Sequence, residues 1–112
     1  MTTVKPWGRE EVLADGSGLR MKILYVQPGK RLSLQYHRRK SEVMFVLAGE
    51  GLATLGLGEY LLCQGDSITI PPGTMHRIEA GAEGDGLAVL EVSTGGGDDD
   101  IVRVEDDYGR AR

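Results

Sequence analysis

The two histidines of the chain stand in settings that suit metal coordination. In the segment Ser33–His37, the alternation of side chains along a strand places Gln35 and His37 on one face. Glu42 follows after a short turn, so a neighbouring antiparallel strand would direct it back toward His37, and His76 comes from a distant strand. Imidazole, carboxylate and amide oxygen form a mixed donor set that suits Zn, Mn, Co, Ni or Fe. We therefore predict one divalent metal ion with coordination positions left open, held by Gln35, His37, Glu42 and His76.

Each of these residues also has an ordinary structural interpretation. A single strand histidine is more often hydrogen-bonded within the fold, Gln35 could be an exposed strand residue, and Glu42 could belong to a surface ion pair. The spacing of the whole set favours the metal. A structural barrel without a metal is the alternative.

Short apolar runs separated by glycine and proline must position these residues. The chain has 17 glycines, and they fall between the apolar runs, as in all-β proteins with tight turns. Many short strands at regular spacing predict a single all-β domain, either a sandwich or a barrel. The expected strands are Met21–Val26, Leu32–Tyr36, Val43–Leu47, Leu52–Leu57, Tyr60–Cys63, Ser67–Ile70, His76–Glu79 and Leu87–Val92, with a further short one at Ile101–Val104.

Composition narrows the class of function. With 112 residues the chain should form one domain, whose small core dimerisation would help to stabilise. A net charge of −4 and a pI near 5.1 argue against a general nucleic-acid binder. The basic run Arg38–Lys40 is then expected to be solvated surface. Because it lies between two expected metal ligands, contact with an anionic substrate is the alternative.

Several other segments carry weaker signals. No signal-peptide core follows Met1, and no apolar stretch approaches the roughly 20 residues that cross a bilayer, so we expect a cytoplasmic protein without a membrane partner. The single cysteine, Cys63, is expected to be a small buried hydrophobe. Trp7 is expected to be a core or interface anchor. The acidic, glycine-rich stretch Gly95–Asp100 is expected to be a solvated linker.

The spacing of these residues resembles the two motifs of the cupin superfamily. The first motif corresponds to Gly29, Gln35 in place of its first histidine, His37, Glu42 and Gly49. The second corresponds to Gly65, Pro71, Gly73, His76 and Ala80, where Ala80 replaces an asparagine. The resemblance implies a double-stranded β-helix, or jelly-roll barrel, over roughly residues 20–93. An N-terminal arm of residues 1–19 and a C-terminal extension of residues 94–112 would complete the domain.

A closer resemblance is to the isomerase domain of bifunctional type II enzymes, which join mannose-6-phosphate isomerase to mannose-1-phosphate guanylyltransferase. Glutamine in the first ligand position is typical of phosphomannose isomerases, and the most family-specific block is Asp99–Arg110. Other matching stretches are Pro6–Gly8, Leu32–Gln35, Ile70–Pro71, His76–Arg77 and Glu91–Val92. The family's arginine before the glutamate is Lys40 here, and its histidine-tryptophan pair is Val43–Met44. The nucleotide loop of the transferase half is absent, so guanylyl transfer is not expected.

This resemblance implies a metal-dependent isomerase that converts mannose 6-phosphate, or an analogue, to fructose 6-phosphate. The reaction moves a proton between C1 and C2, and a metal would stabilise the charge that develops on the two oxygens. Resemblance and charge indicate Arg103 as a catalytic or phosphate-binding residue and Lys22 as a further substrate-binding residue. Surface ion pairs with Glu105 or Glu91 are the alternative for both. Lys40, Glu79 and Asp99 are all candidates for the base. The expected partners are a phosphosugar or related metabolite and a second copy of the chain in a homodimer.

Three other functions are compatible with the same residues. The first is a metal-binding cupin that binds a sugar or metabolite without catalysis, because fold alone does not determine function. The second is a metal-dependent oxygenase of the same fold, which Gln35 disfavours because an amide oxygen makes a harder site. The third is a purely structural barrel.

Overall fold

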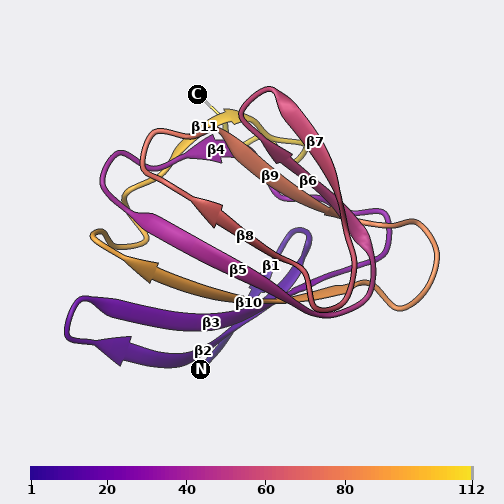
Figure 1. The fold of residues 1–112 in the computed structure, drawn as a ribbon, viewed down its shortest axis with the longest axis horizontal. Helices are drawn as coiled ribbons and strands as arrows, with labels where there is room; N and C mark the ends of the chain where they lie inside the picture. The colour runs from indigo at the N-terminus through magenta and orange to yellow at the C-terminus, as the bar shows by residue number, and fades with distance from the viewer. Residues whose placement is uncertain (112) are drawn as a thin grey trace.

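The computed structural model describes residues 1–111 and contains only strands and turns in that range. Eleven strands form two antiparallel sheets that face each other (Figure 1). The six-stranded sheet has the order β1 (Thr2–Lys5), β2 (Gly8–Gly16), β3 (Leu19–Val26), β10 (Leu87–Thr94), β5 (Ser41–Ala48) and β8 (Ser67–Ile70). The five-stranded sheet has the order β11 (Val102–Glu105), β4 (Leu34–Tyr36), β9 (His76–Ala80), β6 (Gly51–Leu55) and β7 (Gly58–Leu62). The predicted all-β fold is confirmed, and residues 1–111 include no helix long and apolar enough to cross a membrane.

The nine expected strands are all present, but two strands at the N-terminus were missed. The segment that we expected to be an arm forms β1 and β2, and β2 pairs with β3 along most of its length. Its outward residues include Arg9 and Glu11, so the segment lacks the apolar alternation that identifies a half-buried strand. The segment is a strand because its backbone pairs with β3.

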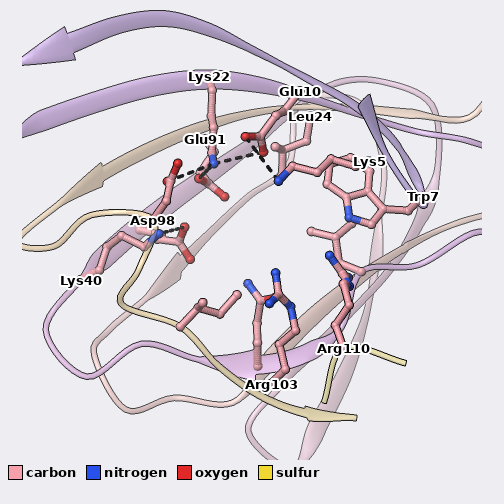
Figure 2. A pocket seen from close by; sticks show the side chains of 14 residues that line it. Lys5, Trp7, Glu10, Lys22, Leu24, Lys40, Glu91, Asp98, Arg103 and Arg110 are labelled. Atoms are coloured by element: carbon pink, nitrogen blue, oxygen red, sulfur yellow. Dashed lines mark hydrogen bonds and ion pairs between the residues drawn. The ribbon is translucent and has the colours of Figure 1, made fainter. Parts of the chain in front are cut away.

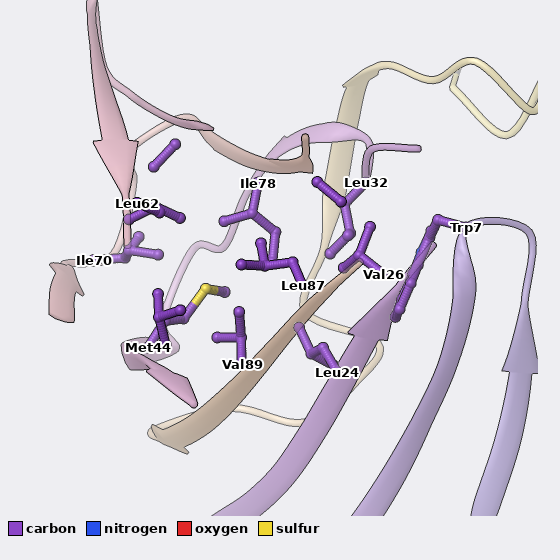
Figure 3. Close-up of a cluster of buried hydrophobic side chains, with 13 residues drawn as sticks. Trp7, Leu24, Val26, Leu32, Met44, Leu62, Ile70, Ile78, Leu87 and Val89 are labelled. Carbon is purple, nitrogen blue, oxygen red and sulfur yellow. The ribbon is translucent and has the colours of Figure 1, made fainter. Parts of the chain in front are cut away.

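The apolar core fills one end of the space between the sheets (Figure 3). Leu24 on β3, Val46 on β5, Val89 on β10 and Ile78 on β9 are each at most 2% exposed. Trp7, at the turn between β1 and β2, closes the side of this cluster, as expected for a core anchor.

At the other end of the barrel the inward-facing residues become polar. The inward register changes from Leu24 to Lys22 on β3 and from Val89 to Glu91 on β10. It changes from Met44 to Glu42 on β5 in the same way. Because β10 runs antiparallel to both of its neighbours, these changes fall at one end of the sheet, and Glu91 is directly paired with Lys22. The fold therefore gathers buried charge at a single end of the barrel.

Turn residues hold the strands in this arrangement. Gly49, between β5 and β6, has φ +90°, and a Cβ there would lie 2.1 Å from the carbonyl oxygen of Gly86. Only glycine fits this close approach of two loops.

Directly after β7, Cys63 is exposed, so the expectation of a buried cysteine was wrong. Leu62 faces the core, and alternation directs the next side chain to solvent.

Candidate metal centre

His37, Glu42 and His76 meet at the polar end of the barrel. His37 directly follows β4, His76 begins β9, and Glu42 lies near the start of β5 in the opposite sheet. The Nε2 atoms of His37 and His76 lie 3.0 and 3.2 Å from Oε1 of Glu42. All three side chains are buried, and one ligand atom of each lies within 4.8 Å of the others. The expected meeting of Glu42 with His37 is present, but it joins two facing sheets and not two neighbouring strands.

Backbone carbonyls orient both imidazole rings. Nδ1 of His37 donates to the carbonyl oxygen of Asp100, and Nδ1 of His76 donates to that of Thr74 at 2.9 Å. Because a carbonyl oxygen only accepts, each ring carries its hydrogen on Nδ1, and the neutral ring has a lone pair on Nε2. This arrangement is typical of metal-binding histidines, whose second nitrogen is held by an outer partner.

The atoms at the centre of the cluster have no well-formed hydrogen bonds. Nε2 of His37, Nε2 of His76 and Oε1 of Glu42 are buried and lack a partner of good geometry. Three lone-pair donors directed at one point repel one another unless a cation lies between them. The residues present therefore suit a divalent metal ion, and His37, Glu42 and His76 could hold it.

Gln35, the fourth expected ligand, lies beside this group. It is paired in register with His76 on β9 and with Arg103 on β11. Its amide oxygen accepts a hydrogen bond of 2.6 Å from the hydroxyl of Ser33. The carbonyl keeps a second lone pair, so Gln35 could bind a metal without losing Ser33.

The segment expected to be a solvated linker supports the centre. The Asp100 carboxylate accepts hydrogen bonds of 2.9 Å from the backbone N–H groups of Arg38, Arg39 and Lys40. The first two of these bonds make the largest contribution in lowering the pKa of Asp100 to about 2. Most of the stretch, Asp99 included, is exposed as expected. The expectation fails at Asp100, which is buried because its carboxylate satisfies backbone donors, and Asp98 forms an ion pair with Arg20.

A cavity of about 90 Å³ (Figure 2) adjoins the cluster through Gln35 and Glu42. On one wall, Nζ of Lys22 lies 3.2 Å from Glu10, 3.7 Å from Glu91 and 3.7 Å from Asp98. Burial would lower the pKa of Lys22, but Glu91, Glu10 and Asp98 raise it. Lys22 is therefore a charged residue whose partners are carboxylates of the protein.

Glu91 and Glu42, on this side of the cavity, have strongly shifted pKa values. Burial, reinforced by the charge of Glu42, raises the pKa of Glu91 to about 8. Burial would also raise the pKa of Glu42, but when the His37 and His76 rings are protonated and no metal is bound, the hydrogen bonds that they donate lower it below its usual range. Glu42 is thus the anionic member of the pair, as a metal ligand must be.

The basic run Arg38–Lys40 is only partly solvated. Arg38 and Arg39 are exposed as expected. Lys40 is buried, with Nζ 3.8 Å from Oε2 of Glu42.

The facing wall carries two arginines. Arg103 is on β11, and Arg110 follows that strand; both line the cavity (Figure 2). Nε of Arg103 is buried without a hydrogen-bond partner. Arg110 is held by Asp106 through Nε at 2.8 Å and Nη2 at 3.0 Å.

The structure separates the three candidates for the base. Lys40 lines the cavity. Glu79 alternates with the inward Ile78 and Ala80 and lies near Arg31, and Asp99 is exposed; neither lines the cavity. Sequence reasoning missed Glu10, Glu91 and Arg110, which do line it. Glu91 had a detectable signal, because it occupies the inward register of an otherwise apolar strand.

Comparison with known proteins identifies the family of the chain. Residues 1–106 match the family model described as mannose-6-phosphate isomerase C-terminal. Mannose-1-phosphate guanylyltransferase of Klebsiella pneumoniae is 36% identical over 108 residues, which are 95% of this chain and 23% of that protein. Alginate biosynthesis protein AlgA of Pseudomonas aeruginosa is 37% identical over 108 residues, 95% of this chain and 22% of that protein. The chain thus spans less than a quarter of the length of these relatives.

Solved structures share the fold. KdgF from Halomonas sp. superposes with a TM-score of 0.78 at 25% identity, covering 87% of this chain and 86% of that one. The cupin-2 domain protein Rru_A2000 from Rhodospirillum rubrum superposes with a TM-score of 0.73 at 25% identity, covering 80% and 61%. The chain has a cupin fold and belongs to the family of mannose-6-phosphate isomerase C-terminal domains.

Proposed function

We propose that this chain is a metal-dependent aldose–ketose isomerase acting on a sugar phosphate, mannose 6-phosphate or a close analogue. The observation that carries the proposal is the buried group of His37, Glu42 and His76, whose unpartnered atoms face one another beside a charged cavity. Membership of the isomerase-domain family supports the same reaction class.

In this proposal His37, Glu42 and His76 hold one divalent ion, and Gln35 completes the ligand set. The donor set is compatible with Zn, Mn, Co, Ni or Fe. When bound, the ion supplies charge stabilisation for the substrate oxygens during proton transfer. The carbonyl groups of Asp100 and Thr74 keep the two rings oriented, so the chain presents the ligands without rearrangement.

The remaining cavity residues handle the substrate and the proton. Isomerisation moves one proton from C2 to C1 and another from the C2 hydroxyl to the C1 oxygen, so a proton-carrying group must stand beside both carbons. Lys40 is our candidate, because it is the only one of the three base candidates that lines the cavity, and it lies next to Glu42. Arg103 binds the substrate from the facing wall. Lys22 lies on the opposite wall and positions the acidic side chains of Glu10, Glu91 and Asp98 there.

The guanylyltransferase activity named for the longer relatives is not proposed for these residues. The chain matches 23% of the Klebsiella protein, and this portion is the one that the isomerase C-terminal model describes.

The test is a coupled assay for fructose 6-phosphate formed from mannose 6-phosphate. Turnover should disappear on chelation, return when a divalent metal is added, and fall at least about a hundredfold in His37→Ala. Arg39→Ala, a change of an exposed residue near the centre, should keep full activity. Metal binding without turnover on any phosphosugar would overturn the isomerase and favour the non-catalytic, metabolite-binding cupin. Metal-dependent oxygen uptake would favour the oxygenase.

A further inference from the structure

The turn that follows β11 brings Arg110 to the cavity without belonging to a sheet. β11 pairs with β4 through Val102, Arg103 and Glu105, and residues 106–111 form no strand. Arg110 nevertheless lines the cavity, and its guanidinium points into it (Figure 2). Side-chain contacts must therefore determine where this turn lies.

The two ends of the turn bind each other. The Asp106 carboxylate accepts hydrogen bonds from the backbone N–H, the Nε and the Nη2 of Arg110, at 2.6, 2.8 and 3.0 Å. The backbone N–H of Gly109 donates to the carbonyl oxygen of Asp106 at 3.3 Å, and the φ of +77° at Gly109 lets the chain turn back. These bonds close the turn on itself, so its place relative to the barrel depends on what binds its middle.

Arg31 binds both residues in the middle of the turn. Its Nε and Nη2 donate to the two carboxylate oxygens of Asp107 at 2.7 and 2.9 Å, the paired geometry of a guanidinium with a carboxylate. Its carbonyl oxygen accepts a hydrogen bond of 3.0 Å from the hydroxyl of Tyr108. The Tyr108 ring also packs against the apolar core. Arg31 thus holds the turn with its side chain and with its backbone.

Arg31 itself has a fixed place on the barrel. It forms an isolated β-bridge with Glu79 of β9, and the backbone N–H of the next residue, Leu32, donates to the carbonyl oxygen of Ile78 at 3.0 Å. Among residues 1–111, those that line the cavity do not include Arg31. Any effect of Arg31 on the cavity therefore passes through the turn.

The ion pair of Arg31 suits positioning better than stabilisation. The side chains of Arg31 and Asp107 are 38% and 44% exposed, and solvent screens the attraction between charges in such a place. The pair therefore contributes only modestly to folding. Two parallel hydrogen bonds still restrict the orientation of the turn, because they set the plane of the carboxylate against that of the guanidinium.

We propose that Arg31 is a positioning residue for the cavity wall that carries Arg110. It holds the turn through Asp107 and Tyr108, so that Arg110 stays at the cavity. The metal centre is supported separately by Asp100, so the loss of Arg31 should leave metal binding intact. The expected effect on substrate rests on the proposed function, whereas the mobility of the turn can be measured without turnover.

The first measurement is the backbone order parameter of the turn by NMR relaxation. In the unaltered protein residues 106–110 should have values near those of rigid backbone, about 0.85, and in Arg31→Gln they should fall below about 0.6. The amides of Arg38 and Lys40, which bind Asp100, should keep their values in both proteins. A turn that stays rigid in Arg31→Gln would overturn the proposal.

The second measurement separates KM from kcat for mannose 6-phosphate. In Arg31→Gln kcat/KM should fall by about tenfold through KM, within the loss that a displacement of about 1 Å can cause, while kcat and metal affinity stay nearly unchanged. Asp107→Asn should have the same effect, and the double variant should be no worse than either single one, because both act through one contact. Arg31→Lys should recover part of the loss, since lysine keeps the charge without the fork.

The control is Arg39→Gln, which makes the same change of charge at an exposed site and should leave KM unchanged. An equal rise of KM in this control would mean a general charge effect and would overturn the role of Arg31. A parallel loss of kcat, metal affinity and melting temperature in Arg31→Gln would make it a structural residue instead. If Arg31→Gln fails to fold, Asp107→Asn, which alters only the exposed partner, provides both measurements.

The outcome can be told apart from that of the isomerase assay. A turn that becomes mobile in Arg31→Gln, with no turnover even in the unaltered protein, would leave Arg31 as the residue that positions the turn and would remove the isomerase. Turnover in the unaltered protein, with the same KM in Arg31→Gln, would keep the isomerase and overturn the positioning role.

Discussion

Nδ1 of His37 donates a hydrogen bond to the backbone carbonyl of Asp100, a residue 63 positions further along the chain. The carboxylate of the same aspartate binds the backbone N–H groups of Arg38, Arg39 and Lys40, directly after His37. One residue of the C-terminal segment thus orients the imidazole and holds the loop that carries it.

Replacing Asp100 should therefore weaken the metal centre. Asp100→Ala leaves three backbone donors without their acceptor, so the loop after His37 loses its anchor. We expect metal affinity to fall by about ten- to hundredfold, the usual effect of losing an outer partner of a ligand, and the melting temperature to fall as well. Metal titration and thermal unfolding measure both effects. Asp99→Ala, at the exposed neighbouring position, should change neither, and an unaltered affinity in Asp100→Ala would contradict this role.

Metal addition should stabilise the protein by linkage. A metal at 100 times its dissociation constant should raise the free energy of unfolding by about 2.7 kcal/mol, provided the unfolded chain does not bind it. In His76→Ala one of the converging donors is lost, and this stabilisation should largely disappear. Urea unfolding with and without metal measures the difference. An equal stabilisation of both proteins would place the metal elsewhere.

The contact between Asp106 and Arg110 should make stability depend on pH in the acid range. Hydrogen bonding with Arg110 makes the largest contribution in lowering the pKa of Asp106 below its ordinary value of 3.8. Since the folded state favours the ionised form, this carboxylate contributes stability above pH about 4 and loses that contribution as the pH falls through its folded pKa. Asp106→Asn should unfold at lower urea than the unaltered protein at pH 6, and the difference should shrink toward pH 3. A constant difference would show that the pair contributes no proton linkage.

Gly49 and Gly65 form a matched pair for testing the packing of the loops. Both have nearly the same positive φ, +90° and +91°. A Cβ at Gly65 meets no atom within 4 Å, whereas one at Gly49 collides with the carbonyl oxygen of Gly86. Gly65→Ala should cost about 1–2 kcal/mol for its backbone conformation alone, and Gly49→Ala should cost clearly more. Denaturant unfolding compares the two, and equal losses would contradict the close approach.

The outer face of the six-stranded sheet should be where two copies of the chain meet. Val43, Phe45 and Leu47 on β5 are 37–44% exposed, and the outward residues of β10 and β3 beside them are also apolar. Polar residues Ser67 and Thr69 on β8 and Arg9 and Glu11 on β2 border this patch, so it has the apolar centre and polar rim of an interface. Light scattering should give twice the chain mass for the unaltered protein and the single mass for Phe45→Asp. Leu57→Asp, at an exposed loop position away from this face, should leave the dimer intact.

The printed sequence was sufficient to predict an all-β domain from its pattern, and the resemblance to cupins implied the barrel and supported the residues that could bind a metal. Side-chain alternation and turn glycines depend only on local chemistry, so Leu34, Gln35 and Tyr36 could be placed on a strand without knowing their neighbours. The motif spacing predicted that His37, Glu42 and His76 would converge, because strand length and turn position determine where each side chain ends. The structure brings these three together.

Only the tertiary structure decided what surrounds them. Glu10 and Asp98 reach Lys22 from segments that looked like an arm and a linker, and Asp100 contacts His37 although 63 positions separate them in the sequence. Arg110 faces the cavity because Asp106 holds its guanidinium, although both follow the last strand in a stretch without periodicity. Such contacts join residues far apart in sequence, and their existence depends on how the two sheets and the C-terminal segment pack. Local pattern, together with the cupin resemblance, therefore predicted the candidate metal ligands, whereas long-range packing decided the charges and hydrogen bonds that surround them and line the cavity.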